Sequence, residues 1–142
     1  MYQENNKKQL NICFGSDTIP KSLNQIFTEE FNSIISYTKK NGLEDFVKRY
    51  NIDIVLFNKD KNGDLFERLR ILRNSYPNIL IFICAEVYTA SDLIQCIDLK
   101  VDARLVQTHK KESLKDIILA CSIKYLQQQK HIKKYLEKQS VL

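Results

Sequence analysis

The sequence predicts an α/β protein with a doubly wound, five-stranded parallel sheet of order 2-1-3-4-5 and an extended C-terminal helix. Short apolar runs alternate with segments in which apolar residues recur at helical spacing, over roughly 120 residues. The links between them are short, which favours parallel strands joined by right-handed helical crossovers. With 142 residues the chain supports one domain, and the flavodoxin-like order is the usual arrangement at this size.

Five strands and five helices are expected in alternation. The strands are predicted at 10–14, 33–37, 53–58, 78–84 and 104–107. The helices are predicted from Pro20 to about Phe31, around 43–50, from about Leu65 to before Pro77, around 93–97, and from about Glu112 onward. The apolar positions that mark the middle three helices are Leu43, Phe46, Val47 and Tyr50, then Leu65, Leu69, Ile71 and Leu72, then Leu93, Ile94, Cys96 and Ile97.

The domain boundaries follow from this pattern. We expect a disordered polar tail at 1–8, one domain at 9–126, and a helical extension, connector or coiled coil at 127–142. No apolar stretch approaches the roughly 20 residues that a membrane span needs, and the N-terminus lacks the apolar region of a signal peptide. A cytoplasmic protein with no membrane association is therefore predicted.

Composition argues against several chemistries. The four cysteines form no C-x-x-C pair, so we interpret them as small buried hydrophobic residues in a reducing compartment. Two histidines without nearby partners make a metal site improbable, and we expect no cofactor. The net charge of +5 comes largely from the C-terminal helix, which we interpret as a solvated face rather than a nucleic-acid surface.

The stretch Asp53-Ile-Val-Leu-Phe-Asn58 is an apolar run that ends on a polar residue. A buried parallel strand of this kind delivers one side chain to the carboxyl edge of the sheet, where open α/β folds bind ligands. Together with Asn41-Gly42 and the run Ile81-Phe-Ile-Cys-Ala85, it resembles the response-regulator receiver domains of two-component signalling. The resemblance covers 9–126 and implies a flavodoxin-like signalling module that is not itself an enzyme.

The resemblance also implies where the phosphorylation chemistry should lie. The phosphoacceptor position falls on Asn58, whose amide cannot form an acyl phosphate. The acidic pair that helps to hold Mg²⁺ falls on Gly15 and Ser16, or on Phe14 and Gly15 in the neighbouring alignment. We therefore expect no metal and no phosphorylation at this site, and we identify the chain as a degenerate pseudo-receiver.

The remaining positions of the pattern are also altered. The hydroxyl residue after the fourth strand falls on Cys84 or Ala85, and the lysine after the fifth strand falls on Gln107. The aromatic residue that turns inward when a receiver is activated falls on Arg104, which we expect to point to solvent or to a partner. Switching coupled to phosphorylation is therefore not expected.

Two other functions stay open. An offset carboxylate, Asp17 or Asp60, could accept a phosphoryl group instead, although aspartates in loops usually form turns. Alternatively, the chain could be a flavodoxin-like domain that binds a small ligand, but no glycine-rich phosphate loop follows the first strand.

The last helix carries apolar residues at alternating three- and four-residue spacing, which is typical of a coiled-coil seam. We expect this seam to join a homodimer, continuing a face formed by the helix around 93–97, the strand at 104–107 and the last helix. Up to about Tyr125 the alternative is contact with the domain's own sheet. The residues proposed for the seam are Ile118, Tyr125, Ile132 and Tyr135.

The final residues, 135–142, resemble the helical connector that leads into a diguanylate cyclase domain. This resemblance implies that the chain is the N-terminal part of a longer regulator with a covalently linked output domain, or that it acts on a protein partner. A parallel pairing of the last helices would bring both C-termini together, as a dimeric output domain requires.

Overall fold

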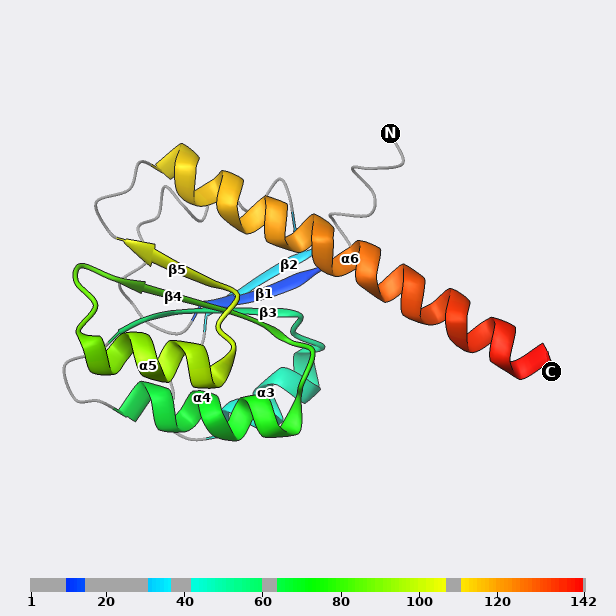
Figure 1. Cartoon of the computed structure of the whole chain (residues 1–142), viewed down its shortest axis with the longest axis horizontal. Helices are drawn as coiled ribbons and strands as arrows, with labels where there is room; N and C mark the ends of the chain where they lie inside the picture. Colours follow the sequence, from blue (N-terminus) through cyan, green and yellow to red (C-terminus); the bar gives the residue numbers. More distant parts are fainter. Residues whose placement is uncertain (1–9, 15–30, 37–41, 60–63, 107–110, 142) are drawn as a thin grey trace.

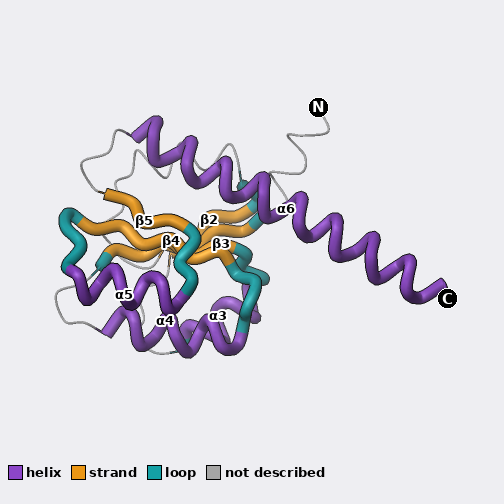
Figure 2. The backbone as a smooth tube through the Cα atoms, in the orientation of Figure 1, coloured by secondary structure: helices purple, strands orange, loops and turns teal. Residues whose placement is uncertain are grey.

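A computed structural model describes residues 10–14, 31–36, 42–59, 64–106 and 111–141 of the chain. The described residues form three layers, in which the sheet lies between α6 on one side and α3, α4 and α5 on the other (Figure 1). Figure 2 shows the strands as the central layer of this arrangement, with the last part of α6 projecting away from it. The expected tail at 1–8 and the helix expected from Pro20 lie outside the described residues.

The sheet has five parallel strands in the order β2-β1-β3-β4-β5, which confirms the predicted topology. Hydrophobic runs are longest in β3 and β4, two of the three strands that have neighbours on both sides. The strands span Asn11–Phe14 (β1), Ser33–Ser36 (β2), Ile54–Asn58 (β3), Leu80–Ala85 (β4) and Ala103–Val106 (β5).

Alternate residues of each central strand enter two separate cores, because successive side chains of a strand point to opposite faces. In β3, Val55 and Phe57 face the core beneath α3, α4 and α5, whereas Ile54 and Leu56 face the core beneath α6. All four side chains are at most 3% exposed, which confirms a strand buried on both faces. β3 therefore delivers its last residue to the edge of a rigid, doubly covered sheet.

The helices span Leu43–Tyr50 (α3), Asp64–Ser75 (α4), Ala90–Leu99 (α5) and Lys111–Val141 (α6). Gly42 precedes α3 with a φ of 84°, a left-handed conformation that glycine adopts without strain. Thr89 caps α5 in a reciprocal capping box with Asp92, which satisfies two backbone N–H groups at the start of that helix.

The apolar residues that mark the helices do not all face the core. Ile71 in α4 and Ile94 and Ile97 in α5 are 48, 60 and 71% exposed, so they do not face the core. α5 instead buries Asp92, Cys96 and Leu99, a narrow stripe at helical spacing. Because the capping box turns Asp92 inward, the two isoleucines are turned towards solvent.

Two aspartates close the amino edge of the sheet. Asp53 precedes β3 and accepts a hydrogen bond of 2.9 Å from the backbone N–H of Asn11 in β1. Asp102 precedes β5 and accepts a hydrogen bond of 2.8 Å from the backbone N–H of Ile81 in β4. Burial raises the pKa of both carboxyl groups above the usual value, even though these hydrogen bonds act in the opposite direction.

Candidate functional site

The candidate site lies at the carboxyl edge of the sheet, where β3 ends at Asn58. This residue is half-buried and lies in register with Cys84 of β4. The backbone N–H of Lys59 donates a hydrogen bond of 2.8 Å to the Cys84 carbonyl, which holds the loop after β3 against β4. Of the two residues proposed for the hydroxyl position, Cys84 is therefore the one that pairs with Asn58, whereas Ala85 pairs with Val106.

Several residues proposed for the site lie outside the described part of the chain. These are Gly15, Ser16, Asp17, Asp60 and Gln107. Asp64 is described and is the exposed first residue of α4. The chemistry of the described edge therefore rests on Asn58, Lys59 and Cys84.

The thiol of Cys84 has little nucleophilic character in this position. Its side chain is half-buried, and burial raises its pKa above the usual value, so the neutral thiol is the dominant form near pH 7. All four cysteines are unpaired thiols, and those of Cys13 and Cys96 are buried. Within the described segments, no group of three or more His, Cys, Asp or Glu residues could hold a metal ion.

An ion pair that the sequence did not reveal joins the candidate site to α5. The Lys59 ammonium donates a hydrogen bond to the Asp92 carboxylate, which is 6% exposed and also accepts the backbone N–H of Thr89. Burial acts to raise the pKa of Asp92, but the hydrogen bonds from Lys59 and Thr89 outweigh it and hold the pKa below its usual value. The only cation directly after Asn58 is thus engaged with a carboxylate of the same chain.

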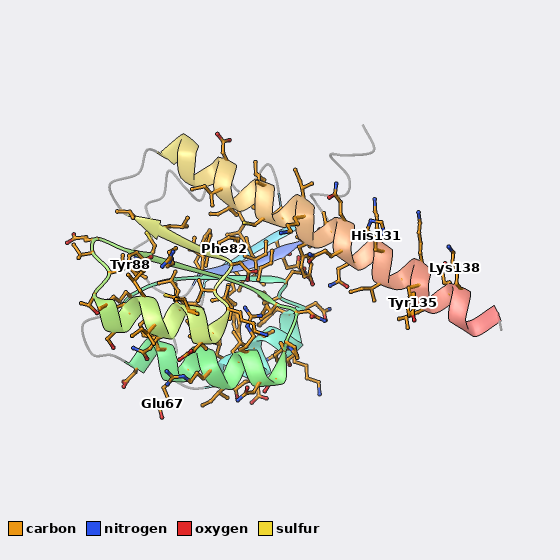
Figure 3. All side chains as sticks on the ribbon, viewed as in Figure 1. Glu67, Phe82, Tyr88, His131, Tyr135 and Lys138 are labelled. Atoms are coloured by element: carbon orange, nitrogen blue, oxygen red, sulfur yellow. The ribbon has the colours of Figure 1, made fainter. Side chains whose placement is uncertain are left out.

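Tyr88 ties the same end of α5 to the sheet (Figure 3). Its hydroxyl lies 2.8 Å from the carbonyl of Ile83 in β4 and 2.8 Å from the carbonyl of Leu105 in β5. Burial raises the pKa of Tyr88, so the hydroxyl keeps the proton that it donates to these carbonyls. The start of α5 is therefore held to three strands, by Lys59 after β3 and by Tyr88 at β4 and β5.

Arg104, proposed at the aromatic position, is exposed on the edge strand β5 and lies in register with Ile83. The Tyr88 ring, rather than a residue of β5, supplies the aromatic group that bridges the two strands. Tyr88 is visible in the sequence as an aromatic residue shortly after the fourth strand. Its hydrogen bonds to β4 and β5 could not be inferred without the fold.

Replacing Lys59 with methionine is expected to lower the free energy of unfolding by about 1–3 kcal/mol, because it leaves a buried carboxylate without its cation. Since the folded-state pKa of Asp92 lies below the usual value, the deficit is present at neutral pH and shrinks as pH falls through that pKa. Urea unfolding over a pH series measures it. Lys59→Arg is the control that keeps the cation, and a deficit independent of pH would contradict the ion pair.

The residues proposed for a dimer seam fall into two groups in α6. Ile118 is buried in the core beneath α6, and Tyr125 packs against the same core, so both contact their own sheet. Ile132 and Tyr135 lie beyond the sheet and are exposed, as is Leu136, which the sequence pattern had not singled out. The part of the seam that could meet a partner therefore begins after Tyr125.

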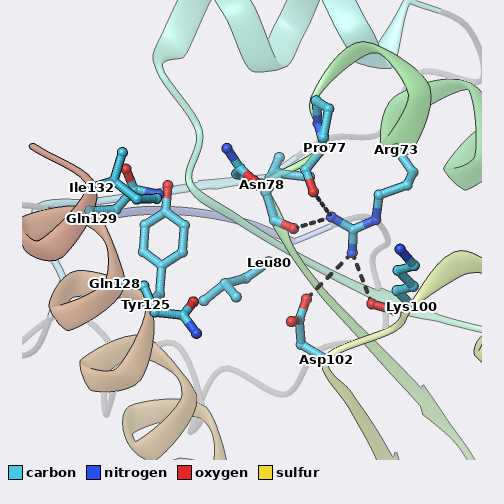
Figure 4. Close-up of a pocket in the computed structure, with 11 residues that line it drawn as sticks. Arg73, Pro77, Asn78, Leu80, Lys100, Asp102, Tyr125, Gln128, Gln129 and Ile132 are labelled. Carbon is cyan, nitrogen blue, oxygen red and sulfur yellow. Dashed lines mark hydrogen bonds and ion pairs between the residues drawn. The ribbon is translucent and has the colours of Figure 1, made fainter. Parts of the chain in front are cut away.

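A cavity of about 230 Å³ lies at the opposite, amino edge of the sheet, where α6 leaves it (Figure 4). Tyr125, Gln128 and Ile132 of α6 form one wall, and Arg73 and Asp102 form the other. It is smaller than the roughly 300–1,000 Å³ that is usual for small-molecule sites. This cavity gives no specific support to a ligand-binding function.

The arrangement defines the class of fold. A parallel sheet of order 2-1-3-4-5, covered by helices on both faces and with its candidate site at the carboxyl edge, is the CheY-like receiver fold. Among the described residues, no helix has the length and apolarity needed to cross a membrane.

Comparison with solved structures agrees with this class. A CheY-like response regulator receiver domain from Methanospirillum hungatei superimposes with a TM-score of 0.72 at 17% identity, over 84% of this chain and 98% of that chain. The N-terminal domain of an uncharacterized Wolinella succinogenes protein superimposes with a TM-score of 0.67 at 15% identity, over 89% of this chain and 98% of that chain. A DNA-binding response regulator of the LuxR family from Staphylococcus aureus superimposes with a TM-score of 0.63 at 18% identity, over 80% of this chain and 99% of that chain.

At these identities the similarity establishes the fold. No protein-family model matches the chain, and no curated protein matches it.

Proposed function

We propose that the protein is a signalling module with a receiver fold that works without phosphorylation and associates through its surface. The observation that carries this proposal is Asn58 at the carboxyl end of β3, where a receiver needs an aspartate. An amide offers no oxygen nucleophile for phosphoryl transfer. The proposal also takes the protein to be a cytoplasmic homodimer without enzymatic activity of its own, linked to an output domain or protein partner.

The electrostatics of the described edge support this proposal. Lys59 is held by Asp92, so its charge is already compensated within the chain. We assign Cys84 to the position of the hydroxyl that binds a phosphoryl oxygen in a receiver, and its raised pKa leaves it a weak hydrogen-bond donor. Neutral residues at this edge also remove the repulsion that clustered carboxylates would cause.

The contacts at the start of α5 favour a module that stays in one conformation over a module that changes conformation on phosphorylation. Tyr88 and the Lys59–Asp92 pair hold this segment to the strands through contacts made entirely within the chain. A module held in one state would signal through partners that meet its surface. Exposed apolar side chains in α5 and α6 provide such surfaces, and they include Ile94, Ile97, Ile132, Tyr135 and Leu136.

Incubation with acetyl phosphate, or with beryllofluoride, in the presence of millimolar Mg²⁺ is expected to leave the intact mass and the melting temperature unchanged. A receiver domain with an aspartate acceptor, treated in the same buffer, is the positive control. A covalent phosphoryl group on the wild-type chain, or stabilisation that requires both beryllofluoride and Mg²⁺, would overturn the proposal and favour acceptance by Asp17 or Asp60.

A further inference from the structure

The projecting half of α6 carries an uncovered apolar stripe. Ile132, Tyr135 and Leu136 are 47, 63 and 60% exposed, and their spacing of three and four residues places them on one side of the helix. In the view of Figure 3, Tyr135 lies on the side of α6 that looks towards the sheet layer. We call Ile132, Tyr135 and Leu136 the α6 stripe.

The α6 stripe continues the face by which α6 packs on its own sheet. Ile118, Tyr125 and Ile132 follow one another at seven-residue intervals, so they lie along one line of the helix. Ile118 is buried in the core and Tyr125 packs against it, while Ile132 lines the cavity beside Tyr125. The stripe therefore opens towards the side of α6 on which the sheet lies.

This direction restricts what can cover the stripe. Packed helices lie about 8–10 Å apart, so a parallel helix in register would need the space that the sheet occupies under the first half of α6. A flat lipid surface meets the same obstacle, because the sheet and three further helices lie on that side (Figure 1). A helix that approaches from the free end of α6 meets neither obstacle.

We propose that two copies of the chain pair through their α6 stripes in an antiparallel direction, an inference that rests on the proposed function as a dimeric module. In an antiparallel pair, the sheet of each subunit lies past the C-terminal end of α6 from the partner subunit, so the sheets do not block the pairing. A register that sets Ile132 against Tyr135 of the partner subunit also sets Tyr135 against Ile132 of the partner subunit, so that paired residue numbers sum to 267. Apolar side chains then meet at the centre of the pairing.

The charges of the projecting half are compatible with this pairing. Its lysines lie on the flanks and outer side of the helix, and they are Lys130, Lys133, Lys134 and Lys138. Like charges on the two copies repel at low ionic strength, but the screening length is about 8 Å at physiological salt. Added salt is therefore expected to tighten the dimer, whereas it would weaken binding of α6 to an acidic partner.

The direction of pairing is tested with a spin label at Lys124→Cys, an exposed position on α6, in a chain whose half-buried Cys84 and Cys121 are replaced by alanine. In the antiparallel register the two labelled positions are separated by 19 residues of helix, or roughly 28 Å along the axis. In a parallel pairing they lie side by side. Pulsed dipolar spectroscopy is expected to give the long distance, and a short distance between labels would overturn the antiparallel arrangement.

The surface is tested by sedimentation at tens of micromolar protein. Ile132→Glu with Leu136→Glu is expected to weaken the dimer at least roughly tenfold, because charges enter the centre of the interface. Ile94→Glu with Ile97→Glu is the matched control, since it charges two apolar residues on α5 that are at least as exposed, and it is expected to leave the dimer intact. A dimer that the α5 variant disrupts and the α6 variant does not would overturn the inference while leaving dimerisation itself supported.

A wild-type chain that stays monomeric under these conditions would remove the dimer from the proposed function as well. The test with acetyl phosphate is independent of this result, so failure of the pairing and failure of the phosphorylation-independent function are distinguishable. Binding to an acidic partner that weakens with salt, without self-association, would show that the α6 stripe serves a different occupant.

Discussion

Replacing Arg73 with methionine is expected to lower the free energy of unfolding by about 2–4 kcal/mol, since five acceptors, two of them in part-buried hydrogen bonds, lose a charged donor together. The guanidinium of Arg73 lies at the amino edge of the sheet, between the end of α4 and the start of β5 (Figure 4). All five of its N–H groups are directed at acceptors within hydrogen-bonding distance: the carbonyls of Pro77, Ile79, Leu99 and Lys100 and the carboxylate of Asp102.

The deficit of this variant should depend on pH. Burial raises the pKa of Asp102 even with Arg73 3.5 Å away, so loss of the guanidinium is expected to raise it further. When a carboxyl group has a raised pKa in the folded state, the free energy of unfolding falls as pH rises and the group ionises. The stability lost on replacing Arg73 should therefore be larger at pH 7 than at pH 4–5. Urea unfolding at both pH values measures it.

The matched control is Arg70→Met, three residues earlier in the same helix. Arg70 is exposed and its one described hydrogen bond, of 3.1 Å, goes to the side chain of Gln95. A change of no more than about 0.5 kcal/mol is expected for this variant. Equal losses for the two variants would show that Arg73 acts through packing rather than through its hydrogen bonds.

Replacing Asn58 with aspartate is expected to yield no acyl phosphate after incubation with acetyl phosphate and Mg²⁺. The substitution supplies a nucleophile, but the positions of the acidic pair and of the strand-five lysine still carry Gly15, Ser16 and Gln107. Without these groups nothing in the pattern holds Mg²⁺ or compensates the charge of the transferred group. Intact-mass measurement tests this, and a phosphoryl adduct on the substituted side chain would contradict it.

The same substitution is expected to cost about 1 kcal/mol of stability at pH 7. It puts a carboxylate at a half-buried position beside the Cys84 thiol, while the neighbouring Lys59 is engaged by Asp92. Burial should raise the pKa of this new carboxyl group, so the loss should disappear as pH falls through the raised value. Asn58→Ala removes the amide without adding charge. Comparing the two variants in urea unfolding therefore separates the cost of losing the amide from the cost of the added charge.

The topology of the sheet could be predicted because it depends on local patterns. Apolar runs such as Ile54–Phe57 cannot be covered on one face only, and their alternation with helical segments leaves few arrangements of a parallel sheet. The placement of Asn58 as the last residue of β3 is also local, since it follows from the end of one strand. The pairing of Asn58 with Cys84 rather than with Ala85 is not local, because it depends on the register between β3 and β4.

The faces of the helices were less predictable. The apolar positions that marked α5 in the sequence include Ile94 and Ile97, yet the structure exposes both and buries Asp92, Cys96 and Leu99. A short helix with apolar residues on two sides is ambiguous until its neighbours are known. Here the neighbours are Lys59, which draws Asp92 inward, and Thr89, which completes the cap.

The sequence by itself determined the parallel sheet and the amide side chain of Asn58 at the end of β3, because strand pattern and residue type are properties of the chain alone. Only the tertiary structure decided that Lys59 pairs with Asp92, 33 residues away. It also decided that the α6 stripe opens towards the sheet. Contacts between distant segments depend on how the layers pack, and no local spacing in the sequence carries that information.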